Sequence, residues 1–104
     1  MASTVELSCS TELATVFVLG ELDVALAVEL RRAVDAAIAA PGERIVIDLA
    51  RVDYIDSTGL GALVGAVTKA EQHAKRLVLR SPSRAARTLL ARTGLTSSFD
   101  VVVA

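Results

Sequence analysis

The residues best able to do chemistry lie in one short segment, YIDSTGLGALVGA, at residues 54–66. An aspartate, two hydroxyls and two glycines stand there between an apolar run typical of a strand and one typical of a helix. A serine beside an aspartate could act as a nucleophile, lie against a bound phosphate, or itself accept a phosphate. These roles compete with a simpler structural one, in which Ser57 and Thr58 are ordinary N-cap residues of the helix.

A hydrolytic role for Ser57 finds little support in the rest of the chain. Ile55 stands where the nucleophile elbow of G-x-S-x-G hydrolases requires glycine. His73 is the one histidine, and it follows Ser57 by sixteen residues, which is about 24 Å along a continuous helix. An aspartate alone is a weak base for a serine at neutral pH. We therefore expect no catalytic residues and no enzyme activity.

A phosphate-binding loop and a metal site are also disfavoured. The glycines of the segment precede a helix, but no lysine completes the G-x-x-x-x-G-K-[ST] pattern. One cysteine and one histidine leave Asp23, Asp48 and Asp56 as the hard metal ligands. Asp23 and Asp56 are more simply interpreted as helix caps, and Asp48 as a hydrogen-bond partner of the loop. The sequence therefore predicts neither a metal nor a cofactor.

Ser57 is better placed to receive a phosphate than to transfer one. It falls in the first turn of the predicted helix, where backbone N–H groups lack partners and the helix dipole is positive. A phosphate there would be tolerated by the fold while it adds up to about two negative charges to the surface. Gly59 and Gly61 would keep the loop low, so that a partner can approach the hydroxyl. Position alone still favours the N-cap interpretation.

The strands and helices that must position this segment are predicted from the spacing of apolar residues and from the capping residues, prolines and glycines at the ends of the elements. Strands are predicted at residues 5–9, 14–20, 45–49, 76–80 and 99–104. Helices are predicted at residues 27–38, from 57 to about 72, and at 82–93. Pro41 and Gly42 end the first helix, and the last one has Ser81 as its cap, Pro82 as its first residue and Gly94 after its end.

These elements predict an α/β fold in one domain, residues 1–104. It is a single mixed, mostly parallel sheet of about five strands that begins with an antiparallel hairpin and is flanked by about three helices. The strand at 45–49 is apolar enough to be covered on both faces. Parallel strands end on one edge of such a sheet, where ligands and partners bind. We therefore expect Asp23, Asp48, Asp56 and Ser57 to meet at one rim.

The composition of the chain argues against some classes of binding partner. Twelve acidic and eleven basic residues give a formal net charge of −1, which argues against a nucleic-acid partner. No apolar stretch approaches the ~20 residues that span a bilayer, so no membrane insertion is expected. Cys9 cannot form an internal disulfide and no signal peptide is present, which predicts a cytoplasmic protein. Cys9 falls on the apolar side of its strand and is expected in the core.

Two segments carry a resemblance to a known family. GELDVALAVELR at residues 20–31 and IVIDLARVDYIDSTGLGALVGA at residues 45–66 resemble the signature segments of the STAS domain, the family of sulfate transporters and anti-sigma factor antagonists. The resemblance extends in register over nearly the whole chain. The D-S-T-G-L-G core is similar to that of the stand-alone bacterial antagonists rather than to that of the transporter-linked branch.

The resemblance implies a phosphorylation switch in which this chain is the substrate. In that family an anti-sigma factor that is also a serine kinase binds the unphosphorylated antagonist and frees the sigma factor. The kinase phosphorylates the serine that directly follows the loop aspartate, Ser57 here, and the complex breaks until a serine phosphatase restores it. The family position of G-E-L-D puts Asp23 beside this serine. The implied partner-binding residues are Asp23, Asp56, Ser57, Thr58, Gly59, Leu60 and Gly61.

Alternatives stay open at this point. The chain could be a non-enzymatic STAS subunit of a membrane transporter that docks on its ATPase, although the intact D-S-T-G-L-G favours the antagonist. It could also be a nucleotide-binding or weakly hydrolytic module, against which the missing lysine and the isolated His73 count. Leu26, where many relatives carry threonine, could extend a contact surface or fill the core. Gly61 and Gly65 could admit a close partner or allow close packing within the domain.

Overall fold

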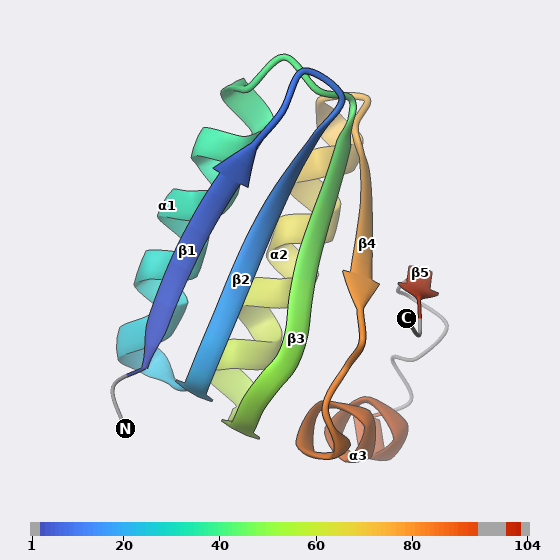
Figure 1. Cartoon of the computed structure of the whole chain (residues 1–104). Helices are drawn as coiled ribbons and strands as arrows, with labels where there is room; N and C mark the ends of the chain where they lie inside the picture. Colours follow the sequence, from blue (N-terminus) through green and yellow to red (C-terminus); the bar gives the residue numbers. More distant parts are fainter. Residues whose placement is uncertain (1–2, 94–99, 103–104) are drawn as a thin grey trace.

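Five strands form one sheet whose order, β1-β2-β3-β4-β5, is also their order in the chain. The strands are Thr4–Cys9 (β1), Leu13–Leu22 (β2), Arg44–Ile55 (β3), Arg76–Arg80 (β4) and Asp100–Val102 (β5). The helices are Val24–Ala39 (α1), Ser57–Gln72 (α2) and Arg84–Thr93 (α3). This computed structural model describes residues 3–93 and 100–102 (Figure 1). β1 pairs antiparallel with β2 and the other pairs are parallel, which confirms the predicted α/β fold.

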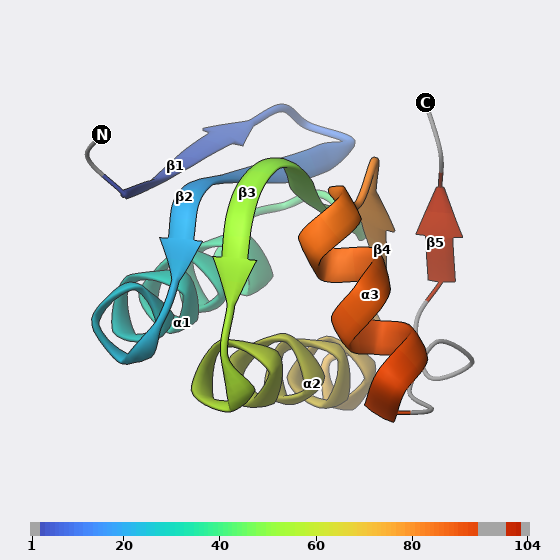
Figure 2. The same ribbon diagram turned by 90° about the horizontal axis from the view of Figure 1, so that it is seen from below.

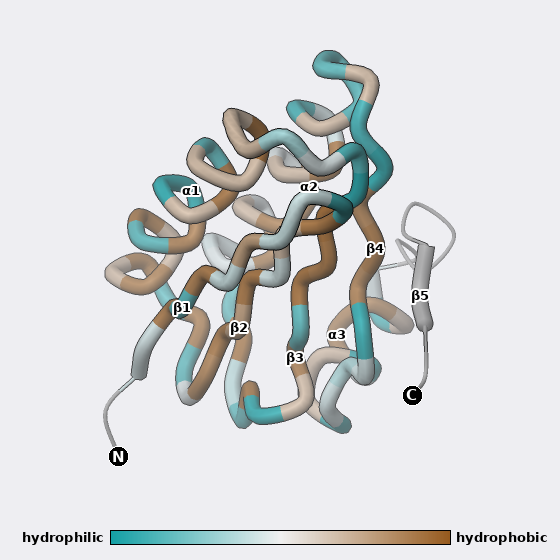
Figure 3. Tube along the Cα trace, turned by 45° about the horizontal axis from the view of Figure 1, so that its top comes forward, coloured by the Kyte–Doolittle hydropathy of each residue, from teal (hydrophilic) through white to brown (hydrophobic). Residues whose placement is uncertain are grey.

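The two long helices, α1 and α2, cover one face of the sheet (Figures 1 and 2). Hydrophobic stretches of β2, β3 and β4 lie side by side in the sheet (Figure 3). No helix of the described residues lies on the opposite face. Ile45, Val46 and Ile47 are nevertheless buried in succession, so this stretch of β3 is buried on both faces as predicted. Thr15 and Val78, which flank Val46 in register on the neighbouring strands, are buried as well.

The helix predicted at residues 27–38 is confirmed, and an apolar stripe holds α1 on the sheet. Its buried residues are Leu26, Ala27, Leu30, Val34 and Ala37, so Leu26 fills the core. The helix ends at Ala39, just before Pro41 and Gly42. Lys75, from the turn between α2 and β4, donates through Nζ to the carbonyl oxygens of Ala37 and Ala40. These carbonyls lie at the negative end of the helix dipole, where a cation is stabilising.

The third helix begins later than predicted. Ser83, rather than Ser81, is its N-cap, because the Ser83 Oγ accepts a hydrogen bond from the Ala86 N–H at 3.3 Å. Ser81 has a φ of 49°, in the left-handed region, whereas an N-cap residue has extended backbone. Pro82 therefore precedes the cap instead of opening the helix. Gly94, the predicted C-terminal glycine, lies outside the described residues.

The edge strand β1 buries less than its alternating pattern predicts. Cys9 pairs in register with the buried Ala14 but is itself exposed, so the prediction that it lies in the core is wrong. The reason is that β1 is the first strand of the sheet and has no neighbouring strand on its outer side. Separately, none of the described helices is both long and apolar enough to cross a membrane.

Candidate functional site

Ser57 lies where β2 and β3 end and α1 and α2 begin. Leu22 and Ile55 are the last paired residues of these two strands. The ends of β2 and β3 lie side by side in Figure 2. Asp23 and Asp56 come next in the chain after these two strands, so they lie at neighbouring strand ends. The structure brings Asp23, Asp56 and Ser57 together as the topology predicts, and we call these three residues the Ser57 rim.

Both aspartates of the Ser57 rim are helix caps. Asp23 Oδ1 accepts a hydrogen bond from the Leu26 N–H at 3.0 Å, and Asp56 Oδ1 accepts one from the Gly59 N–H at 2.8 Å. Each bond satisfies a donor that the first turn of a helix otherwise leaves without a partner. The cap of α2 is thus Asp56, and the N-cap interpretation of Ser57 is wrong: Ser57 is the first helical residue and its side chain is exposed.

The start of α2 offers backbone donors close to the Ser57 hydroxyl. The Gly59 N–H is bonded to the Asp56 side chain, and the Leu60 N–H to the Asp56 carbonyl at 3.0 Å. The N–H groups of Ser57 and Thr58 have no such partner within the described part of the chain. They point, with the positive end of the helix dipole, toward the space an added phosphate would enter.

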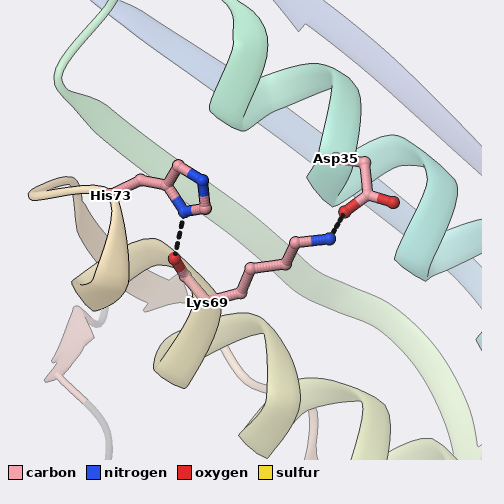
Figure 4. Close-up of polar contacts among 3 residues, drawn as sticks. All are labelled: Asp35, Lys69 and His73. Atoms are coloured by element: carbon pink, nitrogen blue, oxygen red, sulfur yellow. Dashed lines mark hydrogen bonds and ion pairs between the residues drawn. The ribbon is translucent and has the colours of Figure 1, made fainter.

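No base serves Ser57. His73 is the C-cap residue at the opposite end of α2, and its Nδ1 is hydrogen-bonded to the Lys69 carbonyl at 2.9 Å (Figure 4). Lys69 in turn forms an ion pair with Asp35 of α1. Within residues 3–93 and 100–102, no group of three or more histidine, cysteine, aspartate or glutamate side chains could hold a metal ion. His73 and the Lys69–Asp35 ion pair therefore lie at the end of α2 away from Ser57.

Two of the residues expected to bind a partner lie inside the molecule. A Cβ atom on Gly59 would stand 2.2 Å from the carbonyl oxygen of Leu22, so this glycine allows the first turn of α2 to pack against the end of β2. Leu60 is part of the hydrophobic core. Thr58 is half-buried and Gly61 is exposed, with open space where a side chain would be.

Asp48 does not reach the Ser57 rim, and the prediction that it would is wrong. β3 continues for seven residues beyond Asp48, to Ile55, which is roughly 23 Å of extended strand. The Asp48 side chain instead accepts a hydrogen bond from Arg80 Nε at 2.9 Å and forms an ion pair with Arg80 Nη2 at 2.9 Å. The Arg80 guanidinium also lies 5.7 Å from the centre of the Phe17 ring. This network joins β2, β3 and β4 across the face that carries no helix.

Three exposed hydrophobic side chains flank the Ser57 rim and were missed in the sequence. Val24 and Val28 of α1 are 65% and 44% exposed, and Tyr54 at the end of β3 is 50% exposed. Tyr54 pairs in register with Glu21, two residues before Asp23. Exposed hydrophobic residues that gather at one place mark a contact surface. The signal available in the sequence was the position of the two valines off the apolar stripe of their helix.

Comparisons with known proteins agree on one family. The family model of the STAS domain matches residues 4–103. The anti-sigma-B factor antagonist of Listeria monocytogenes is 36% identical over 86 residues, which are 83% of this chain and 75% of that protein. The solved structure of the anti-sigma factor antagonist SpoIIAA in its unphosphorylated form matches 99% of this chain and 88% of its own, with a TM-score of 0.79 and 26% identity. The phosphorylated form of Bacillus SpoIIAA matches 99% of this chain and 91% of its own, with a TM-score of 0.75 and 26% identity.

Proposed function

This chain belongs to the STAS domain family, and on that premise we propose that it is an anti-sigma factor antagonist switched by phosphorylation of Ser57. The unphosphorylated form binds an anti-sigma factor that is also a serine kinase, and the sigma factor is released. The kinase phosphorylates Ser57 and the complex breaks. A serine phosphatase then restores the binding form. The chain is the substrate of these reactions, which take place in the cytoplasm, and not their catalyst.

One observation carries the proposal: an exposed serine at the start of α2, beside two backbone N–H groups that have no partner among residues 3–93 and 100–102, with the one histidine at the other end of the helix. A nucleophilic serine needs a base, and a structural serine at this place would be the cap, which is Asp56 instead. An exposed hydroxyl at a helix start fits a kinase substrate, because the dipole and free N–H groups stabilise the product phosphate there.

The phosphorylated chain should remain folded. An anion near a helix N-terminus is stabilised by about 0.3–1 kcal/mol, which works against the repulsion between the phosphate and the neighbouring Asp56 carboxylate. The two forms of SpoIIAA support this, because the unphosphorylated and the phosphorylated structure both match this fold over 99% of the chain. Phosphorylation would therefore change the surface and leave the core as it is.

Binding, by contrast, should collapse on phosphorylation. A partner that covers Val24 and Tyr54, both largely exposed beside the Ser57 rim, would also enclose the Ser57 hydroxyl. A phosphate enclosed in that contact without a cationic partner would cost several kcal/mol. Since each ~1.4 kcal/mol is a tenfold change in affinity, the affinity should fall by about two decades or more.

The test combines the purified chain, ATP and the kinase-type anti-sigma factor of its source organism, with intact mass and peptide mapping as the readout. We expect one phosphate, on Ser57. Ser57→Ala should resist the kinase and bind constitutively, and Ser57→Asp should bind more weakly than the unmodified chain. Thr58→Ala is the matched control, because Thr58 is half-buried and its loss should leave phosphorylation intact.

Two results would contradict the proposal. The first is phosphate found only on residues other than Ser57. The second is a Ser57→Asp variant that binds the anti-sigma factor as tightly as the unmodified chain. Either result would mean that phosphorylation of Ser57 is not the switch.

A further inference from the structure

The row of α2 residues that begins with Ser57 continues with two glycines, which have no side chain. Ser57, Gly61, Gly65 and Lys69 follow one another at intervals of four residues in α2, so they form one row along the helix. Ser57, Gly61, Gly65 and Lys69 are all exposed. A partner that reaches the Ser57 hydroxyl therefore lies next to two positions at which its backbone can approach that of α2.

Neither glycine serves packing within the domain. A Cβ atom on Gly61 or on Gly65 would meet no atom of the described residues within 4 Å, in contrast to one on Gly59. Glycine inside a helix destabilises it relative to alanine, and nothing in this fold requires the missing side chains. The space beside both glycines is therefore open to a contact from outside the domain.

Gly65 lies in one wall of a groove between α1 and α2, and Gly61 precedes it by one turn in the same row. The groove encloses about 240 Å³ and is lined by Arg31, Val34, Asp35, Ala62, Gly65, Ala66 and Lys69. On α1, the exposed Val28 and Val24 precede the groove residue Arg31 at helical spacing, so they lie between the groove and the Ser57 rim. The end of the groove nearest Ser57 is thus flanked by apolar side chains, while the Asp35–Lys69 ion pair bridges the two helices at the far end (Figure 4).

We propose that this groove, which we call the α1–α2 groove, seats a helix of the anti-sigma factor with an apolar face. The inference rests on the proposed function and extends its contact surface beyond the Ser57 rim. A helix fits because two parallel helices present ridges with a groove between them, and small residues let a third backbone come close. An added strand would need a free sheet edge, which α1 and α2 do not offer.

The charges at the far end of the groove further define the occupant. Arg31, Asp35 and Lys69 carry both signs, so they suit the polar rim of a protein interface better than a lipid surface. The seated helix should place apolar side chains against Val24 and Val28 and polar ones against these charges. The seated helix would pass directly beside Ser57. A phosphate on Ser57 would therefore block its approach to the groove.

The test fills the groove at Gly65. Gly65→Ala and Gly65→Leu are compared with Glu71→Leu, which adds a leucine on the other flank of the same helix, where Glu71 is exposed. Titration calorimetry measures binding to the purified anti-sigma factor kinase, and thermal unfolding measures stability. Gly65→Ala should unfold at or above the temperature of the unmodified chain, since its Cβ has open space. Gly65→Leu should bind roughly ten- to a hundred-fold more weakly, and Glu71→Leu should bind normally.

The outcomes separate this inference from the function on which it rests. If Gly65→Leu binds as tightly as the unmodified chain while Ser57→Asp does not, the α1–α2 groove is not part of the interface and the switch at Ser57 stands. If Glu71→Leu weakens binding as much as Gly65→Leu, the effect is not specific to the groove and the inference fails. If the unmodified chain binds no anti-sigma factor kinase, both fail.

Discussion

Replacing Gly59 by alanine should destabilise the domain, although the same change two residues later should stabilise it. A Cβ at Gly59 would lie 2.2 Å from the Leu22 carbonyl oxygen and 2.8 Å from the Leu22 Cγ, and Cβ atoms essentially never come closer than 3.0 Å to such neighbours. The first turn of α2 would have to move by roughly 1 Å to restore ordinary contact. Leu22 is fully buried and its carbonyl accepts the Asp56 N–H, so it has little freedom to yield.

The cost of overpacking at Gly59 can be compared with the gain in helix propensity that alanine brings. Overpacking of this kind costs about 1–3 kcal/mol, and the gain in helix propensity from glycine to alanine is at most about 1 kcal/mol. We therefore expect Gly59→Ala to lose about 1–2 kcal/mol, or roughly 4–12 °C in unfolding temperature for a domain of this size. Gly61→Ala has only the propensity gain, because its Cβ would meet nothing within 4 Å.

Urea unfolding followed by far-ultraviolet circular dichroism measures both variants. The midpoint should shift to lower urea for Gly59→Ala and to equal or higher urea for Gly61→Ala, with unchanged slopes. A Gly59→Ala domain as stable as the unmodified one would refute the claim that this glycine is required by packing. A marked loss of stability in Gly61→Ala would show that its open space is filled in solution.

Two further predictions concern the ends of α1. Asp23→Ala should cost about 1 kcal/mol of unfolding free energy because it removes the cap on the Leu26 N–H, whereas Asp23→Asn should keep the cap and most of the stability. If Asp23→Asn keeps its stability but binds the anti-sigma factor more weakly, the negative charge of Asp23 contributes to binding. If Asp23→Asn is as unstable as Asp23→Ala, the hydrogen bond to the Leu26 N–H is not what stabilises the helix. Lys75→Met should lower the unfolding free energy by about 0.5–1.5 kcal/mol, since the Ala37 and Ala40 carbonyls lose their donor. Equal urea midpoints for Lys75→Met and the unmodified chain would show that water replaces the lysine without loss.

Much of this fold could be predicted because its signals are local. The apolar stripe of α1, its end before Pro41 and the start of α2 after Asp56 each depend on residues that are close together in the chain. Once the elements were known, the rule that parallel strands end on one edge was enough to bring Asp23 and Ser57 together. The sequence alone therefore determined the fold class and the place of the Ser57 rim.

The tertiary structure decided what depends on neighbours distant in the chain. Only the pairing of β3 with β2 shows that the strand runs on to Ile55, which carries Asp48 away from the rim and onto Arg80. Only packing distinguishes Gly59, pressed against Leu22, from Gly61, which faces open space two residues later. The two glycines share the same local pattern, but the atoms around each come from elements that the local sequence does not contain. The exposed fraction of Tyr54 was decided in the same way, because whether a strand residue is covered depends on what packs against its face of the sheet.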